Sequence, residues 1–132
     1  MRLLKSHNNT SGQILTSVLV FMAFGLSVVA LSATLTIINM QNTAKLAQSE
    51  QASNYAEAGA EESVLRLIRD PSYNGGDLSI ATDATITIQV VANGDDRTIT
   101  STATYNGFTK KVLAQVHLAN GKVSLVSWKQ II

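Results

Sequence analysis

The first third of the chain is strongly apolar and carries no charge. Residues 6–44 contain no Asp, Glu, Lys or Arg, and residues 14–33 read ILTSVLVFMAFGLSVVALSA. Twenty helical residues extend over about 30 Å, which is roughly the thickness of the hydrocarbon core of a bilayer. The pattern predicts a transmembrane helix, because the remaining polar sequence is too short to enclose so apolar a helix in a soluble fold. The polar residues of this run are Thr16, Ser17, Ser27 and Ser32, whose hydroxyls can bond back to the preceding helical turn.

Charges on the two sides of this segment predict its orientation. Arg2 and Lys5 precede it, whereas the first charge after it is Lys45. Positive residues favour the cytoplasmic side of a membrane, so we expect the N-terminus to stay in the cytoplasm and the remainder to be exported. A cleaved secretory signal peptide is the competing interpretation. The apolar run is longer than the core of such a peptide and has no break before a small-residue cleavage site, which favours a helix that continues.

Polar residues follow the apolar segment, and Pro71 is the first proline. We predict one helix over about residues 13–70, ending at Asp70 because Pro disfavours helical geometry in the residue before it. Glu62 and Arg66 have the i, i+4 spacing of a helical ion pair. One apolar stripe of the exported half is expected to face the core; its members are Tyr55, Ala56, Gly59, Ala60, Val64, Leu67 and Ile68.

The C-terminal half is rich in β-branched residues between turn signals, a pattern typical of a β-meander. Asn106-Gly107 and Asn120-Gly121 are two-residue hairpin turns. After a loop at residues 71–83, the predicted strands are residues 85–92, 97–105, 108–119 and about 122–128.

The same turns predict the register of the sheet. With a four-residue loop at residues 93–96, all three connections place one apolar set on one face. We expect Gly59 and Ala60 of the helix to pack, small against small, on the middle of that face, at Ser101, Ala103 and Ala114. The predicted pairs include Val90 with Ile99, Ile86 with Ala103, Ser101 with Val112, Leu118 with Val123 and Val116 with Leu125.

The opposite face is predicted to be a ladder of threonines with one apolar patch. The register places Leu113, Val126 and Trp128 outward on neighbouring strands, which suits contact with another subunit. A bend after Ser127 that tucks Trp128 under a loop is an equally open alternative. The predicted fold class is therefore α+β: a long N-terminal helix, membrane-spanning in its first half, packed by its exported half on a four-stranded antiparallel β-meander.

Composition narrows the possible chemistry. The 132 residues suit one folded domain, and a formal charge of +1 gives no direct signal for nucleic acid. The absence of Cys excludes disulfides, thiol catalysis and thiolate metal sites. His7 and His117 lie far apart, and Asp95-Asp96 in a turn supplies too few oxygens for calcium, so we expect no metal and no cofactor. Glu57, Glu61 and Glu62 lack a partner base or nucleophile, and we do not expect an enzyme.

Two segments resemble a known family. The leader MRLLKSHNNTSG ends at Gly12, directly before the apolar helix, and residues 56–67 read AEAGAEESVLRL. Together they resemble type IV prepilins and pseudopilins, most closely a PilX-type minor pilin. The resemblance implies that a prepilin peptidase cuts after Gly12 and that Gln13 becomes a free, N-methylated terminus.

The chain departs from major pilins at two positions of its first helical turns. Major pilins usually have Phe at the first mature position and Glu at the fifth, where this chain has Gln13 and Ser17. Family members without that Glu are typically tip or initiating subunits, so the resemblance implies a minor pilin. Gly25 is a further candidate contact, because it allows close approach of another helix.

The functional prediction is a structural subunit of a type IV pilus or type II secretion pseudopilus. Its regions are a leader (residues 1–12), a transmembrane helix (13–40), an exported amphipathic helix (41–70) and a sheet (71–132), the last two forming one pilin-like domain. The expected partners are the peptidase, other pilin or pseudopilin subunits, the inner-membrane assembly platform and the lipid bilayer. The expected location is the inner membrane, single-pass, then the cell surface. The alternative is an uncleaved single-pass membrane protein whose β-domain binds a ligand or partner.

Overall fold

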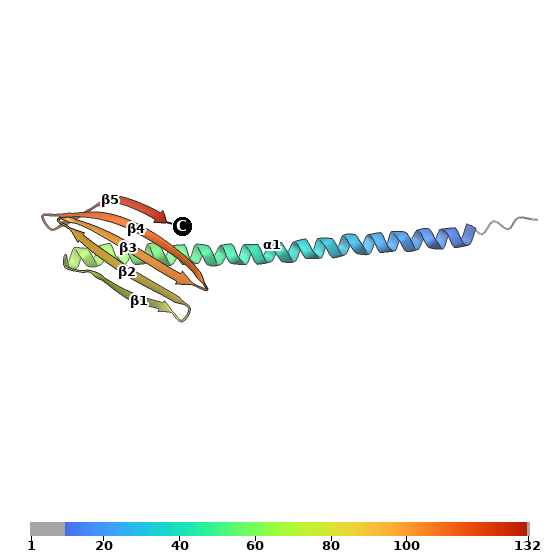
Figure 1. Ribbon diagram of the computed structural model, residues 1–132, viewed down its shortest axis with the longest axis horizontal. Coiled ribbons are helices and arrows are strands. Elements are labelled where there is room, and N and C mark those ends of the chain that lie inside the picture. Colours follow the sequence, from blue (N-terminus) through green and yellow to red (C-terminus); the bar gives the residue numbers. More distant parts are fainter. Residues whose placement is uncertain (1–9, 132) are drawn as a thin grey trace, which may run out of the picture. The chain divides into compact units, whose positions relative to one another are not determined.

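A computed structural model describes residues 10–131 of the chain. It contains one helix and one antiparallel sheet, which confirms the α+β class with a long N-terminal helix (Figure 1). The chain divides into two compact units, one up to Asn42 and one from Thr43 onward. The elements are α1 (Thr10–Arg69), β1 (Gly75–Ala81), β2 (Ala84–Asn93), β3 (Asp96–Tyr105), β4 (Phe108–Ala119) and β5 (Lys122–Ile131).

The sheet has five strands in the order β1-β2-β3-β4-β5, so the prediction of four strands was wrong. The additional strand, β1, occupies most of the predicted loop at residues 71–83 and pairs Leu78 with Ile86 of β2. Gly75 and Gly76 suggested a loop, but they stand at the beginning of β1, where Gly75 has a φ of 110°. Glycine tolerates that conformation, and an added Cβ at Gly75 would collide with the Ile88 carbonyl.

The predicted register is confirmed for the β2–β3 and β3–β4 hairpins and for β4–β5 as far as the pair of Val116 and Leu125. β2 and β3 pair Val90 with Ile99, and β3 and β4 pair Ser101 with Val112. At the β3–β4 turn, Asn106 and Gly107 have φ values of 46° and 82°, the left-handed pair that a type I′ turn requires.

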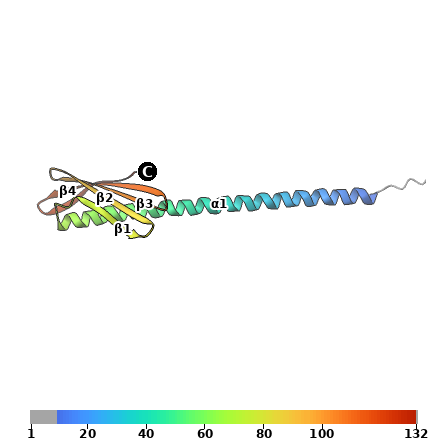
Figure 2. The ribbon, with the colours of Figure 1, turned by 60° about the horizontal axis from the view of Figure 1, so that its bottom comes forward.

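The core of the second unit lies between α1 and one face of the sheet (Figures 1 and 2). The predicted packing of small residues on small residues is confirmed: Gly59 approaches both Ser101 and Ile86 so closely that a Cβ would stand 2.6 Å from Ile86 Cγ2. Ile68 is 55% exposed and does not belong to the buried stripe. The buried cluster consists of Ala56, Ala60 and Leu67 from α1 and Ile86, Ile88, Ile99, Ala103, Val112, Ala114 and Val116 from the sheet.

Polar groups close α1 at its C-terminal end. The Ser72 N–H donates to Asp70 Oδ1 at 2.9 Å, and the Ser72 hydroxyl donates to the same oxygen. These two bonds lower the pKa of Asp70 and form the local turn that stops the helix. One turn earlier, Arg66 Nε donates to Glu62 Oε1 at 2.8 Å, as the i, i+4 spacing predicted.

β5 contains a β-bulge that the sequence analysis did not anticipate. Val116 pairs with Leu125 as predicted, but the next pairs are Gln115 with Ser127 and Ala114 with Trp128, so that Val126 is an extra residue. Trp128 therefore shares the face of Ala114 that packs on α1. The prediction that Trp128 lies outward beside Leu113 was wrong, because one inserted residue inverts the side chains that follow it.

The close contact at Gly59 can be tested by introducing a larger side chain there. Gly59→Leu should lower the free energy of unfolding by about 1–3 kcal/mol, because the new side chain has to displace Ile86 or Ser101. Thermal unfolding of the full chain in detergent micelles, followed by circular dichroism, measures the effect. Ala58→Leu, at an exposed neighbour on the same helix, should change stability by less than about 0.5 kcal/mol. Equal effects of the two substitutions would contradict the packing.

The bulge makes a prediction about the single tryptophan. Deleting Val126 should give a regular strand in which Leu125 and Trp128 still face α1, so the fluorescence maximum of Trp128 should not change. If β5 were regular in the native chain, with Trp128 outward, the same deletion would turn the indole inward. A shift of its emission to the blue would therefore contradict the bulge.

Candidate membrane anchor and processing site

The first part of α1 is an apolar helix whose side chains are exposed. Every residue from Gly12 to Asn42 is exposed. A helix with this length and composition can cross a membrane. Its exposed large apolar residues are Ile14, Leu15, Val18, Leu19, Val20, Phe21, Met22, Phe24, Leu26, Val28, Val29, Leu31, Leu35, Ile37, Ile38 and Met40.

The hydroxyl groups in this part of α1 satisfy their own hydrogen bonds. Each donates to the carbonyl four residues earlier, as Ser27 does to Ala23 at 2.8 Å and Ser32 does to Val28 at 2.9 Å. This confirms the expected back-bonding. A donor without a partner in hydrocarbon costs several kcal/mol, so these bonds make the hydroxyls compatible with lipid. The same bond is made by Thr16, Ser17, Thr34 and Thr36.

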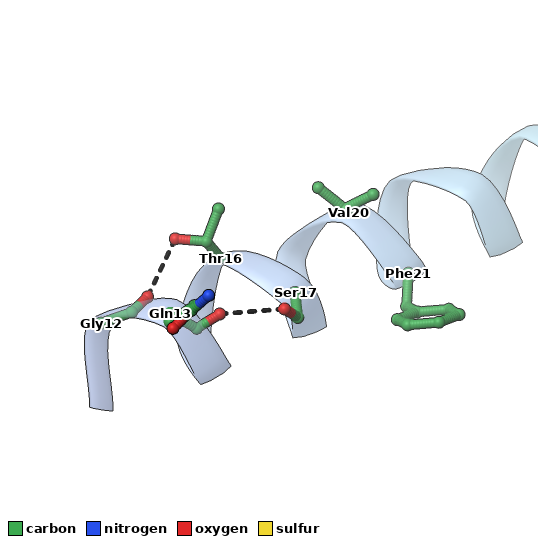
Figure 3. A pocket seen from close by; sticks show the side chains of 6 residues that line it. All are labelled: Gly12, Gln13, Thr16, Ser17, Val20 and Phe21. Atoms are coloured by element: carbon green, nitrogen blue, oxygen red, sulfur yellow. Dashed lines mark hydrogen bonds between the residues drawn. The ribbon is translucent and has the colours of Figure 1, made fainter. Parts of the chain in front are cut away.

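The first turns of α1 bring together the residues of the expected processing site. Thr16 donates to the Gly12 carbonyl and Ser17 donates to the Gln13 carbonyl, each at 2.9 Å (Figure 3). With Val20 and Phe21 these residues line a shallow depression on the helix surface. None of the six residues has an ionisable side chain, so the depression offers no side-chain acid or base.

Gly12 and Gly25 are open positions on the exposed helix. An added Cβ at either residue would have no other atom within 4 Å. At Gly12, the missing side chain lowers helix propensity by up to about 1 kcal/mol relative to Ala. The bond after Gly12 therefore lies next to a residue of low helix propensity. At Gly25, the missing side chain leaves a notch between exposed apolar neighbours.

The structure separates the three candidate contact residues of the sheet. Leu113 is half-buried on the face away from α1, and Val126 is 63% exposed at the bulge. Trp128 lies on the other face. There it lines a groove of about 490 Å³, which we call the α1–β5 groove, with Glu61, Val64, Leu65 and Leu125. Leu65 and Leu125, which also line the groove, are not among the site residues predicted from the sequence.

Ionisable groups of the sheet form one pair on its outer face. Asp96 Oδ1 and His117 Nδ1 are 2.6 Å apart, and both side chains are largely exposed. Within residues 10–131, no three Asp, Glu or His side chains gather as metal ligands would. His7, Arg2 and Lys5, with the rest of the leader up to residue 9, lie outside the described residues.

Comparisons with protein-family models, with curated proteins and with solved structures find no match to this chain.

Membrane insertion can be measured with single cysteines, because the native chain has none. In liposomes, Val29→Cys should resist a water-soluble maleimide, whereas Ala58→Cys, exposed in the second unit, should react. The bilayer excludes the reagent, so detergent should make Val29→Cys reactive. Reaction of Val29→Cys in intact liposomes as fast as that of Ala58→Cys would contradict insertion.

Proposed function

We propose that this chain is a minor pilin-like structural subunit, anchored in the inner membrane and packed into a type IV pilus or type II secretion pseudopilus through its N-terminal helix. The observation that carries the proposal is the exposed apolar part of α1, which begins beside Gly12 and belongs to the same helix that packs on the sheet. A free-standing soluble domain has no use for such a helix, because its apolar side chains would all face water.

The anchor serves two environments in turn. Before assembly its apolar side chains contact lipid, and after assembly they contact the equivalent helices of other subunits. Lipid tails are as apolar as these side chains, so association depends on close packing. The notch at Gly25 permits such an approach.

Ser17 distinguishes this subunit from one that carries a charge in its anchor. A carboxylate at that position would need a neighbouring amine to enter the apolar interior of a filament, because an unpaired charge there is costly. The Ser17 hydroxyl instead bonds within its own helix. The subunit can therefore start an assembly or cap it without an existing neighbour, which is the role of a tip or initiating subunit.

Processing uses the low helix propensity of Gly12. A prepilin peptidase cuts the bond between Gly12 and Gln13, which frees the Gln13 amine for N-methylation. The leader stays on the cytoplasmic side and the sheet on the outer side of the membrane, as Arg2 and Lys5 favour. The subunit then passes from the membrane to the assembly platform and reaches the cell surface.

An uncleaved membrane protein with a binding domain is the second candidate. The α1–β5 groove favours it, because an exposed apolar groove is a common binding feature. In that case the anchor is permanent and the sheet domain recruits its partner at the membrane surface.

N-terminal sequencing separates the two candidates. Co-expression with an active prepilin peptidase should give a new terminus at Gln13. Gly12→Val should abolish the cut, because a β-branched side chain stiffens the first turn and fills the open position. Gly25→Val, in the same helix but away from the bond, is the matched control and should be cut normally. An intact Met1 in the presence of active peptidase would contradict the pilin proposal and favour the uncleaved protein.

A further inference from the structure

β5 is an edge strand with a long accessible side. It pairs with β4 alone, so along its ten residues one side of the backbone has no strand partner within residues 10–131. The opposite edge, β1, has seven residues, begins with two glycines and carries the exposed Asp77. β1 is therefore the shorter of the two edges. With ten residues against seven, and with five large apolar side chains, β5 offers the longer and more apolar edge.

The α1–β5 groove lies beside this free edge. Its floor and walls include Val64, Leu65, Leu125 and Trp128, and its lining is mainly apolar. Leu125 is 59% exposed, Leu65 53% and Trp128 38%, which is unusual for neighbouring large apolar side chains in a small folded domain. Gln130 Nε2 donates to Ser53 Oγ, which is a further contact between β5 and α1.

The helical wall of the groove carries a carboxylate, that of Glu61. Ser53, Glu57, Glu61 and Leu65 are spaced by four and form one row along the β5 side of α1. Within the described residues, neither Glu57 nor Glu61 forms an ion pair. The basic residues at the two ends of β5 do not neutralise them, because Lys122 and Lys129 pair with Ala119 and Leu113 and so belong to the other face of the sheet.

We propose that the α1–β5 groove binds an extended basic segment of a partner protein, which adds to the free edge of β5 as a further strand. Its backbone hydrogen-bonds to β5, alternate apolar side chains cover Trp128 and Leu125, and a Lys or Arg on the same face lies against Glu61. The row of carboxylates selects the charge of the partner, and the edge strand selects its extended conformation. This inference does not rest on membrane insertion or filament assembly.

Trp128 makes the proposal measurable, because it is the only tryptophan of the chain. The probe is the capped peptide TVTKTVT, added to the full chain in detergent micelles. Its two Val and its Lys project from one face when it is extended. We expect saturable binding with a shift of the Trp128 emission to the blue, as the peptide removes water from the indole. The peptide TVTETVT should bind about tenfold more weakly, since its Glu faces Glu61.

Charge reversal tests the acidic wall without disturbing the core. Glu61 is exposed, so Glu61→Lys should keep the fold and should reverse the preference between the two peptides. Glu61→Gln should lower the affinity for TVTKTVT by about threefold, which is the effect expected for the loss of one exposed ion pair. Asp77→Asn is the matched control, because it removes one exposed carboxylate from the opposite edge of the sheet and should leave binding unchanged.

Two neighbouring residues of β5 test the floor of the groove. Leu125→Ser should lower the affinity at least about tenfold, whereas Val126→Ser, equally exposed but at the bulge and outside the groove, should have little effect. Circular dichroism checks that both variants keep the fold. If Leu125→Ser unfolds, the Glu61→Lys variant and its preference between the two peptides still test whether the groove binds a basic segment.

Three outcomes would overturn the proposal. Absence of any spectral change with TVTKTVT means that the groove does not accept a strand. Equal binding of a peptide whose alternate amides are N-methylated means that β5 makes no backbone bonds with it. If the Trp128 emission shifts to the blue as the protein concentration rises in the absence of peptide, the occupant of the groove is a second copy of the chain.

Discussion

The close approach of α1 to the sheet at Gly59 is the constraint on which the folded unit depends. Ala56, Gly59 and Ala60 let the helix backbone come near the sheet, where Ser101, Ala103 and Ala114 leave room for it. The small residues contribute little apolar area themselves. They allow the larger side chains around them, such as Leu67 and Val112, to be fully buried, each worth about 1.5–3 kcal/mol. The fit has a cost, because the buried Ser101 hydroxyl has no partner among the described residues.

Most of the sheet could be predicted because its turns are short and chemically explicit. An Asn-Gly turn fixes which residues face each other, and the alternation of side chains then assigns both faces. β1 escaped prediction because its glycines resemble a loop and because Leu78 and Ile80 are its only large apolar residues. Its pairing with β2 depends on tertiary contact that a local pattern does not contain. The exposed Ile68 shows the same limit. Helical periodicity predicts which residues lie on one side of the helix, but it does not predict at which residue that side stops contacting the sheet.

The two candidate sites differ in how far the sequence reveals them. An anchor is defined by composition and length, and the back-bonded hydroxyls follow from helix geometry alone, so this site was predictable in detail. The α1–β5 groove depends on one bulged residue, Val126, which sets the side of the sheet that Trp128 occupies. A signal was present: Leu125 and Trp128 are three residues apart, and two apolar residues at that spacing share a face of a strand only if a bulge lies between them.

A membrane anchor would lower the affinity that the groove needs in order to recognise a partner. A short strand added to one edge, with a few apolar contacts and one ion pair, binds weakly when both partners diffuse freely in solution. If both partners are held in the same membrane, they share a thin layer, and the effective concentration of one for the other rises as it does for linked binding modules. Weak strand addition then suffices for recognition, and it remains reversible. A membrane-spanning helix and a weak groove, although they belong to different parts of the chain, would in this way favour the same membrane-bound partner.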